Sequence, residues 1–349
     1  IGDKGDEFRD PDHLYADDLD IFGDGGLFQL LCVARTRMGK QQLAHWLLYP
    51  SPVLEAQDRH HAVLELKQKI DLREDLAVTG QQENINADPE KLRGWAGRDI
   101  DFNAGLWTAL GTLLPTLTVA ALVYAVLSYL RSGAAIWTPL LFLLLVNGMV
   151  MHRLRHGMRQ LFADLDQACN NLHALSGIVR RIEAEQFFSP RLQHLQKKLI
   201  SGPEPASRAI ARLGTLCDLE NSRSNMVAQL LEFLVLYSVQ VAAALQRWRK
   251  RYGSSVAQWL DAIGEMEALL SMGAYAYEHP QDPFPEFHAE GDPCFAATAL
   301  GHPLLAARNC VRNDVSLDPR DQVLLVSGSN MSGKSTLLRA TGINAVLAM

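Results

Sequence analysis

Residues 328–335 have the types and spacing of a phosphate-binding loop. They fit the pattern G-x-x-x-x-G-K-[ST], and they are Gly328, Ser329, Asn330, Met331, Ser332, Gly333, Lys334 and Ser335. The glycines at the two fixed positions let successive backbone N–H groups point into one concave anion site. The N-terminus of a helix directly after the loop adds partial positive charge. The pattern therefore predicts a site for the phosphates of a nucleotide.

Two side chains of this loop have predicted roles with ATP and Mg²⁺, the cofactors that we expect. Lys334 reaches the β- and γ-phosphates, and the hydroxyl of Ser335 is placed to ligate Mg²⁺. Such a loop promotes phosphoryl transfer to water by positioning and by electrostatic stabilisation. The sequence reaches Met349 before any Walker B acid. The catalytic residues therefore stay unknown, and ATP hydrolysis is expected only of the full-length protein.

A strand and a helix are expected to position this loop. The apolar run at 323–326 precedes it within a candidate strand at 322–327, and a predicted helix at 336–349 follows it. This strand–loop–helix order is the context that the motif requires. A second candidate strand covers 295–299, and a proline-rich linker at 279–285 indicates a domain boundary. We therefore expect the start of an α/β P-loop domain at 279–349.

Two apolar segments lie in the middle of the chain. Residues 102–130 contain no charged side chain, and a second uncharged stretch covers 132–151. Each segment reaches the length of about 20 residues that crosses a bilayer core. Trp107, Tyr129 and Trp137 lie near the segment ends, where amphipathic rings favour the membrane interface. The pattern predicts a transmembrane helical hairpin at 102–151, and a buried hairpin in a soluble core is the alternative.

Basic residues flank both ends of this segment, whereas its central turn has only Arg131. The flanking residues are Lys91, Arg93, Arg98, Arg153, Arg155 and Arg159. By the positive-inside rule both ends face the cytoplasm. We therefore expect the protein in the cytoplasmic membrane, with its ATPase and helical parts on the cytoplasmic side.

Most of the remaining sequence has helical periodicity. Helices are predicted at 26–48, 53–68, 71–78, 152–187, 206–251 and 259–272, with a loop at 201–205. Arg247, Arg249, Lys250 and Arg251 fall in the predicted last turn of the helix at 206–251, where cations complement the helix dipole or contact phosphate. The chain therefore divides into a first helical part (1–101), the hairpin (102–151), long helices (152–278) and the segment with the phosphate-binding loop (279–349).

The composition excludes some classes of protein. The 349 residues are 48% hydrophobic and 21% charged, which is typical of a folded chain. The 33 basic and 39 acidic residues give a net charge of -6, which argues against a globally basic nucleic-acid coat. The five cysteines form no C-x-x-C pair, which argues against a disulfide scaffold or zinc knuckle and favours a reducing compartment. Because the chain ends inside an apolar helical pattern, we expect it to be a piece of a longer protein.

Several motifs together resemble the MutS mismatch-repair family, a group of ATPases related to the ABC ATPases. Thr336 extends the loop to G-x-N-M-x-G-K-S-T, which resembles the phosphate loop of that family. The Gly-His-Pro-Leu sequence within 300–305 resembles the start of its ATPase domain, and Asn-Asp-Val at 313–315 resembles the strand before the loop. The helical sequences within 26–47 and 259–271 are similar to its helical core. The resemblance covers about 15–100 and 205–349.

The resemblance implies a homodimer that binds ATP between its protomers and acts on double-stranded DNA. Cys310 occupies the place where bacterial members of the family put an aromatic against adenine, so Val311 and Asn313 are the candidates for the adenine side. The hairpin departs from the family pattern, and the amino-terminal mismatch-reading domain is not seen in this sequence. We expect a membrane-anchored, MutS-like ATPase. The alternatives are an ABC-type transport ATPase and a membrane-tethered scaffold that uses ATP as a switch and does not bind DNA.

Overall fold

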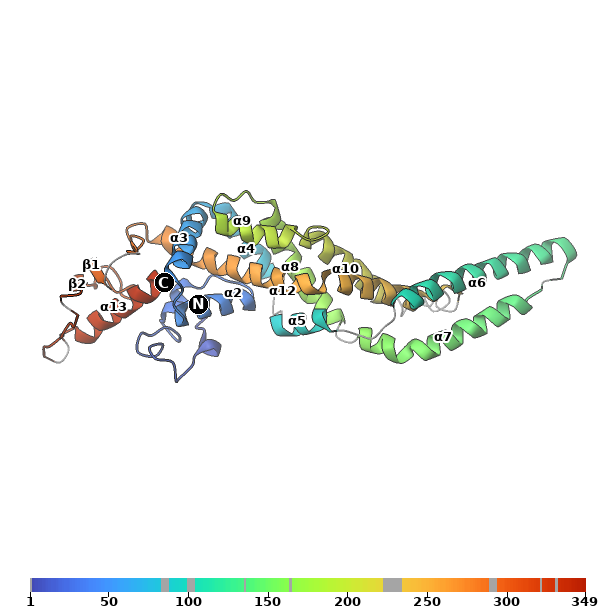
Figure 1. The fold of residues 1–349 in the computed structure, drawn as a ribbon, viewed down its shortest axis with the longest axis horizontal. Coiled ribbons are helices and arrows are strands. Elements are labelled where there is room, and N and C mark those ends of the chain that lie inside the picture. The colour runs from blue at the N-terminus through green and yellow to red at the C-terminus, as the bar shows by residue number, and fades with distance from the viewer. Residues whose placement is uncertain are drawn as a thin grey trace. The chain divides into compact units, whose positions relative to one another are not determined.

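The computed structural model describes residues 2–82, 88–98, 104–134, 136–162, 165–221, 234–288, 294–320, 322–329 and 332–349. Within these residues the chain is mostly helical and has one two-stranded sheet (Figure 1). The chain divides into two compact units, and each is described by itself. Unit 1 comprises Ile1–Ile85, Ala184–Lys198 and Asp261–Met349, and unit 2 comprises Asn86–Glu183 and Leu199–Leu260.

The helices of unit 1 pack around large apolar side chains. They are α1 (Leu27–Leu31), α2 (Arg37–Leu48), α3 (Val53–Gln68), α4 (Ile70–Gln82), most of α9 (Pro190–Ile200) and the second part of α12 (Tyr237–Glu278), and a short 3-10 helix, Asp6–Phe8, precedes them. Phe28, Leu43 and Leu66 are fully buried, and removing such side chains from water is the main driving force for this packing. The helix predicted at 53–68 is confirmed, and the helix predicted at 71–78 is the longer α4.

The predicted single helix at 26–48 is wrong, because a distant carboxylate holds the backbone between two helices. Glu267 of α12 accepts hydrogen bonds from the backbone N–H groups of Arg35 and Thr36, each at 3.2 Å. The Thr36 hydroxyl in turn accepts a hydrogen bond from the Gly39 N–H at 3.1 Å and caps α2. The backbone around residue 35 is therefore extended rather than helical, and α1 and α2 are separate.

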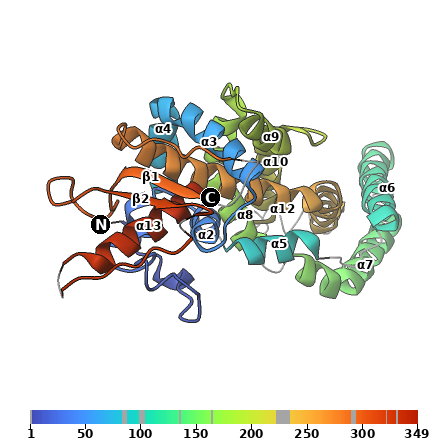
Figure 2. The same ribbon diagram turned by 60° about the vertical axis from the view of Figure 1, so that its left-hand side comes forward.

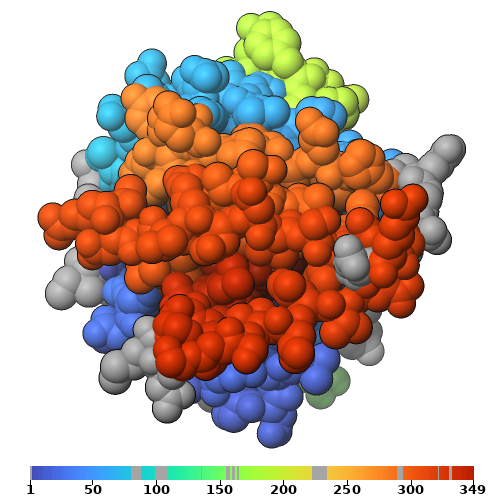
Figure 3. Space-filling view, turned by 90° about the vertical axis from the view of Figure 1, so that its left-hand side faces the viewer, coloured from blue at the N-terminus to red at the C-terminus, as the bar shows by residue number. Residues whose placement is uncertain are grey.

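The sheet of unit 1 is an antiparallel pair, β1 (Phe295–Leu300) and β2 (Asn313–Leu317), where strands were predicted at 295–299 and 313–315. Phe295 pairs with Leu317 and Leu300 with Asn313, and the register shifts between Ala297 and Leu300. Helix α13 (Lys334–Ala348) lies beside this sheet in Figures 1 and 2. In Figure 3 the C-terminal residues gather on one face of unit 1, next to residues of the N-terminal segment.

The strand predicted at 322–327 does not form. A β-strand needs hydrogen bonds to a neighbouring strand, and within the described ranges only β1 and β2 pair with each other. The apolar side chains of Val323 and Leu325 are instead 84% and 88% exposed. The described part of the segment at 279–349 therefore contains a small antiparallel sheet and one helix. The expected start of an α/β P-loop domain is not confirmed.

Unit 2 contains α5 (Pro89–Gly97), α6 (Ala104–Ser132), α7 (Thr138–Phe162), α8 (Leu165–Ala184), α10 (Ala206–Asn221) and the first part of α12. Helices α6 and α7 form a hairpin and lie side by side (Figures 1 and 2). Gly133, with φ of 69°, lies in its turn, and Pro139 lies in the first turn of α7, where a missing N–H is tolerated. Inside the hairpin the buried Asn147 amide donates a hydrogen bond to the Thr118 hydroxyl at 3.1 Å.

Helix α12 is longer than the sequence indicates. It contains both the 247–251 basic cluster and the predicted helix at 259–272. The cluster is therefore not in a last turn, and the predicted boundaries at 187 and 251 are wrong: α8 ends at Ala184, α10 at Asn221 and α12 at Glu278. The residues from 152 that were assigned to the helix at 152–187 belong to α7 as far as Phe162.

The side chains of the basic cluster have different surroundings. Arg249 is buried, and its guanidinium donates hydrogen bonds to the backbone oxygens of Trp95 and Arg98 at the end of α5. It neutralises the negative end of that helix and supplies donors for its last carbonyl groups. The neighbouring aromatic side chains of Trp248 and Tyr252 are buried, so they pack inside unit 2. Arg247, Lys250 and Arg251 remain exposed.

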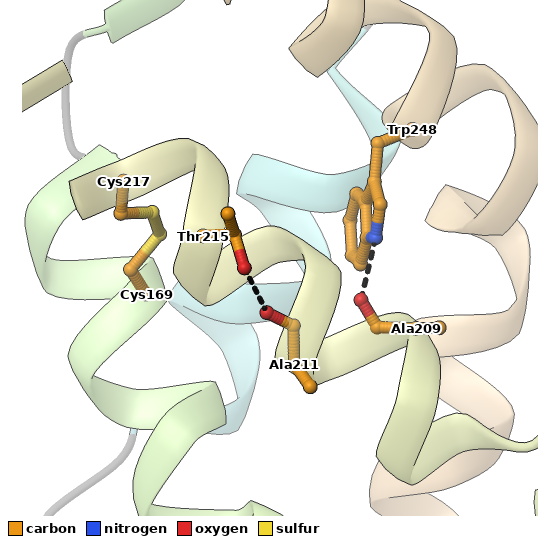
Figure 4. Close-up of a disulfide and its surroundings, with 6 residues drawn as sticks. All are labelled: Cys169, Ala209, Ala211, Thr215, Cys217 and Trp248. Atoms are coloured by element: carbon orange, nitrogen blue, oxygen red, sulfur yellow. Dashed lines mark hydrogen bonds between the residues drawn. A yellow bond between two sulfur atoms is a disulfide. The ribbon is translucent and has the colours of Figure 1, made fainter. Parts of the chain in front are cut away.

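Two of the five cysteines form a disulfide, which the sequence pattern did not indicate. The bond joins Cys169 of α8 to Cys217 of α10 (Figure 4). Their Cα atoms are 6.6 Å apart, within the range that a disulfide spans. The pairing crosses 48 residues of sequence and depends on how the two helices pack. The spacing of the cysteines therefore did not reveal it.

Candidate nucleotide-binding site

The predicted phosphate-binding loop leads directly into a helix. Helix α13 begins at Lys334, and Gly333 before it has φ of 83° and ψ of 11°. This left-handed conformation favours glycine, because a Cβ there would be strained. The first N–H groups of a helix have no acceptor within the helix, so this turn can present donors to an anion. Asn330 and Met331 lie outside the described residues.

The Lys334 side chain reaches back over the start of the loop. Its ammonium donates hydrogen bonds to the backbone oxygens of Gly328, at 2.8 Å, and of Ser329. The side chain is half-buried, whereas Ser335 and Thr336 are exposed in the first turn of α13. The amino group is therefore held beside the loop by two neutral acceptors. Phosphate oxygens can replace these acceptors and form stronger, charge-assisted hydrogen bonds.

The loop is tight at its first glycine. A Cβ on Gly328 would lie 3.0 Å from the Ser332 hydroxyl oxygen and 3.9 Å from the Lys334 Cδ. Glycine is therefore favoured at Gly328 because neighbouring side chains approach closely, and at Gly333 because the backbone is left-handed. We expect the loop backbone to hold a phosphate group, with Lys334 as the counter-charge and the exposed Ser335 hydroxyl as a ligand for Mg²⁺, and both roles stay predictions.

The Gly301-His302 segment joins α13 to the turn before β2. The Asn344 amide of α13 donates to the backbone oxygen of Gly301 at 2.9 Å, and the His302 N–H donates to the Cys310 Sγ at 3.2 Å. Burial lowers the pKa of the His302 imidazole, and the nearby Arg339 lowers it further. Sequence reasoning identified the Gly-His-Pro segment but missed Asn344. A polar residue in the otherwise apolar third turn of the helix was the available signal.

The two candidates for the adenine side lie near this segment. Val311 is 80% exposed, and the Asn313 amide donates to the backbone oxygen of Val311 at 3.2 Å. Asn313 is the first residue of β2 and pairs with Leu300, and Val311 lies in the turn two residues before it. Their contact with adenine stays a prediction.

The N-terminal segment holds the other side of α13. Arg339 forms an ion pair with Asp20 at 2.6 Å, and a Cβ on Gly342 would meet the Leu19 side chain at 2.6 Å. The N-terminal segment therefore contributes to the position of the helix that follows the loop. Arg339 is too distant from Asp20 in sequence for a local pattern to indicate this ion pair.

The α6–α7 hairpin carries the apolar surface that the sequence analysis singled out. Ala109–Ser132 is long and apolar enough to cross a membrane, and only 28% of its most apolar stretch is buried. The apolar part of α7, Thr138–Leu154, is shorter. The exposed large side chains are Leu113, Leu117, Val119, Val123, Tyr124, Val126, Leu127, Tyr129, Leu130, Leu141, Phe142, Leu145 and Met149. Contact with lipid stays a prediction.

Comparison with known proteins finds a similarity to a MutS protein. No protein-family model matches the chain. The DNA mismatch repair protein MutS of Myxococcus xanthus (strain DK1622) is 27% identical over 178 residues. The match covers 48% of this chain and 16% of that protein, so this chain spans a small part of its relative's length. At this identity and coverage the similarity suggests a MutS-related family and no finer assignment.

Proposed function

We propose that the chain is the nucleotide-binding part of a MutS-like ATPase that is anchored in a membrane. The observation that carries the proposal is the position of Lys334, whose ammonium is held by the oxygens of Gly328 and Ser329 beside the left-handed Gly333. The similarity to a MutS protein supports the same class. ATP is the proposed ligand, and the phosphates would bind at the N-terminus of α13.

The chemistry proposed for this site is positioning and charge neutralisation. Lys334 would exchange its two carbonyl partners for oxygens of the β- and γ-phosphates, and backbone N–H groups of the loop would surround them. Mg²⁺, held in part by Ser335, would neutralise further phosphate charge. Because no general base is assigned in this chain, ATP binding is proposed for the chain itself and hydrolysis for the full-length protein.

The proposed membrane anchor is the α6–α7 hairpin. Its exposed surface is formed by large apolar side chains, such as Leu127 at 52% and Phe142 at 66%. Its polar residues Thr118 and Asn147 are fully buried and hydrogen-bonded to each other across the hairpin. Polar groups inside and apolar groups outside is the arrangement that a hydrocarbon solvent favours.

The proposed macromolecular partner is double-stranded DNA, bound by a homodimer. The motif resemblance and the MutS relative suggest this partner, and the exposed Arg247, Lys250 and Arg251 of α12 are the local basic cluster that could contact phosphates. Arg249 is excluded from this role, because it is buried and bonded to the end of α5. A membrane-tethered scaffold without DNA is the alternative that the experiment below separates.

Fluorescence anisotropy with the detergent-solubilised chain tests the DNA proposal. Matched and mismatched duplexes are titrated with and without ATP, at several salt concentrations. We expect salt-sensitive binding that ATP alters in the wild type and leaves unaltered in Lys334→Ala, and weaker binding for Lys250→Glu than for the exposed control Lys197→Glu. No binding at low salt would overturn the DNA proposal and leave the ATP-switched scaffold.

A further inference from the structure

The disulfide of unit 2 lies at one end of a helix pair that is held at both ends. Helices α8 and α10 are antiparallel neighbours, because Glu183 near the end of α8 accepts hydrogen bonds from the Ser207 N–H, at 3.0 Å, and from its hydroxyl at the start of α10. Cys169 and Cys217 join the opposite ends (Figure 4). One turn from the disulfide, a Cβ on Gly214 would lie 3.9 Å from the His173 Nδ1, so the helices are close there as well.

The environment of the disulfide limits its chemistry. Cys169 and Cys217 are 6% and 5% exposed. An external thiolate needs to reach one of the two sulfur atoms, so exchange requires α8 and α10 to separate locally or the attacking molecule to be small. The carboxylate–hydroxyl contact at the other end of the pair does not depend on redox state. Reduction therefore releases one end of the helix pair and leaves the other end in place.

We propose that Cys169 and Cys217 form a redox-sensitive lock between α8 and α10. In the oxidised state the disulfide holds the two helices together, and in the reduced state that end can open. This device is independent of the nucleotide site and of the proposed function. It assigns a regulatory role to two buried residues in the same unit as the apolar hairpin, and α8 begins three residues after α7 ends.

The redox step is ordinary thiol–disulfide exchange with a small thiol such as glutathione. The glutathione thiolate attacks one sulfur, forms a mixed disulfide and releases the other cysteine as a thiolate. A second glutathione thiolate attacks the mixed disulfide, releases the remaining cysteine thiolate and leaves as glutathione disulfide. Two electrons pass from two glutathione molecules to the protein, and the two protons lost from the glutathione thiols end on the two cysteines.

The other cysteines provide the controls. Cys294 is exposed, whereas burial raises the pKa of Cys32 to about 11, which makes its thiol a poor nucleophile at neutral pH. A triple variant, Cys32→Ser, Cys294→Ser and Cys310→Ser, keeps only the proposed pair. A double variant, Cys169→Ser and Cys217→Ser, removes the pair. The wild-type protein is reduced and reoxidised without any substitution, so the test does not depend on either variant folding.

The experiment combines peptide mass mapping with hydrogen–deuterium exchange in glutathione buffers of graded ratio. In oxidising buffer we expect a cross-linked peptide pair containing Cys169 and Cys217, lost reversibly as the ratio of glutathione to its disulfide rises. Amide exchange in α8 and α10 should rise on reduction, by about tenfold to a thousandfold, and the double variant should match the reduced wild type in both buffers.

Three outcomes would overturn the proposal. One is two free thiols in the triple variant under oxidising buffer. Another is a cross-link that no glutathione ratio reduces, which would make the bond a permanent staple. The third is reduction without any change of exchange in α8 and α10, which would leave the helix pair closed regardless of redox state.

Discussion

Replacing Gly39 by alanine tests the contact between α2 and α12 that separates α1 from α2. A Cβ at position 39 would lie 2.2 Å from the Glu267 Oε2, 2.7 Å from the Glu267 Cβ and 3.0 Å from the Ala34 Cβ. The two distances to Glu267 are shorter than real Cβ contacts, so Glu267 has to move. The carboxylate would then lose its hydrogen bonds to Arg35 and Thr36, and the cap of α2 would weaken with them.

The expected loss of stability follows from two destabilising contributions and one stabilising contribution. Overpacking costs about 1–3 kcal/mol. Weakening the hydrogen bonds of a buried carboxylate adds about 1.5–3 kcal/mol. The higher helix propensity of alanine returns about 1 kcal/mol. We therefore expect Gly39→Ala to lower the free energy of unfolding by about 2–4 kcal/mol.

Thermal unfolding in detergent, followed by circular dichroism, measures this loss. A decrease of about 5–10 °C in Tm is expected for Gly39→Ala. The matched control is Gly94→Ala, because Gly94 is also helical but a Cβ there would have no atom within 4 Å. The control should gain up to about 1 kcal/mol. A Gly39→Ala protein as stable as the control would refute the inferred packing of α2 on α12.

Two other substitutions test the buried carboxyl and the hairpin. Burial raises the pKa of Glu267 above its ordinary value of 4.5, so the stability that the protonated group contributes at low pH is lost as the pH rises from 4.5 through the folded-state pKa. Glu267→Gln should flatten this fall of Tm with rising pH, and an unchanged slope would contradict the assignment. Val123→Arg places a charge on the exposed apolar face of α6, where it costs about 2.5–3.5 kcal/mol in a bilayer core, so it should reduce flotation with phosphatidylcholine vesicles. Leu54→Arg, at a residue of α3 that is 77% exposed, is the control, and equal flotation of the two variants would count against a membrane-embedded hairpin.

Local signals predicted the elements that neighbouring residues determine. Helix α3 has its predicted bounds, and the two uncharged stretches on either side of Arg131 indicated the helical hairpin. The strand β1 and the helix after the phosphate-binding loop were also found, because each has a sharp change of pattern at its boundary. These signals lie within a few residues of the boundary that they mark, so a local sequence pattern is enough to detect them.

Contacts between distant residues account for most of the errors. The break before α2 depends on Glu267, 231 residues after Thr36. The role of Arg249 depends on the end of α5, and the pairing of Cys169 with Cys217 depends on how α8 packs on α10. None of these partners is within reach of a local window. The strand predicted at 322–327 was wrong for a related reason, since a strand requires a neighbour to pair with.

The candidate site was predictable as a motif but not as an arrangement. The spacing of Gly328, Gly333 and Lys334 identified the loop, and the structure adds the left-handed Gly333 and the oxygens that hold the lysine. It also adds Asn344, whose bond to Gly301 ties α13 to the segment before β2. The attraction between the Lys334 ammonium group and a bound phosphate is the central element of the proposed function.

Equilibrium binding of a fluorescent ATP analogue, with Mg²⁺, to the full chain and to Lys334→Ala tests that element most directly. The exposed Lys197→Ala is the charge-matched control. The account predicts that Lys334→Ala weakens binding by about tenfold or more, the loss expected for hydrogen bonds to a charged group, and that Lys197→Ala leaves it unchanged. Equal affinity of the wild type and Lys334→Ala would contradict the proposed nucleotide site.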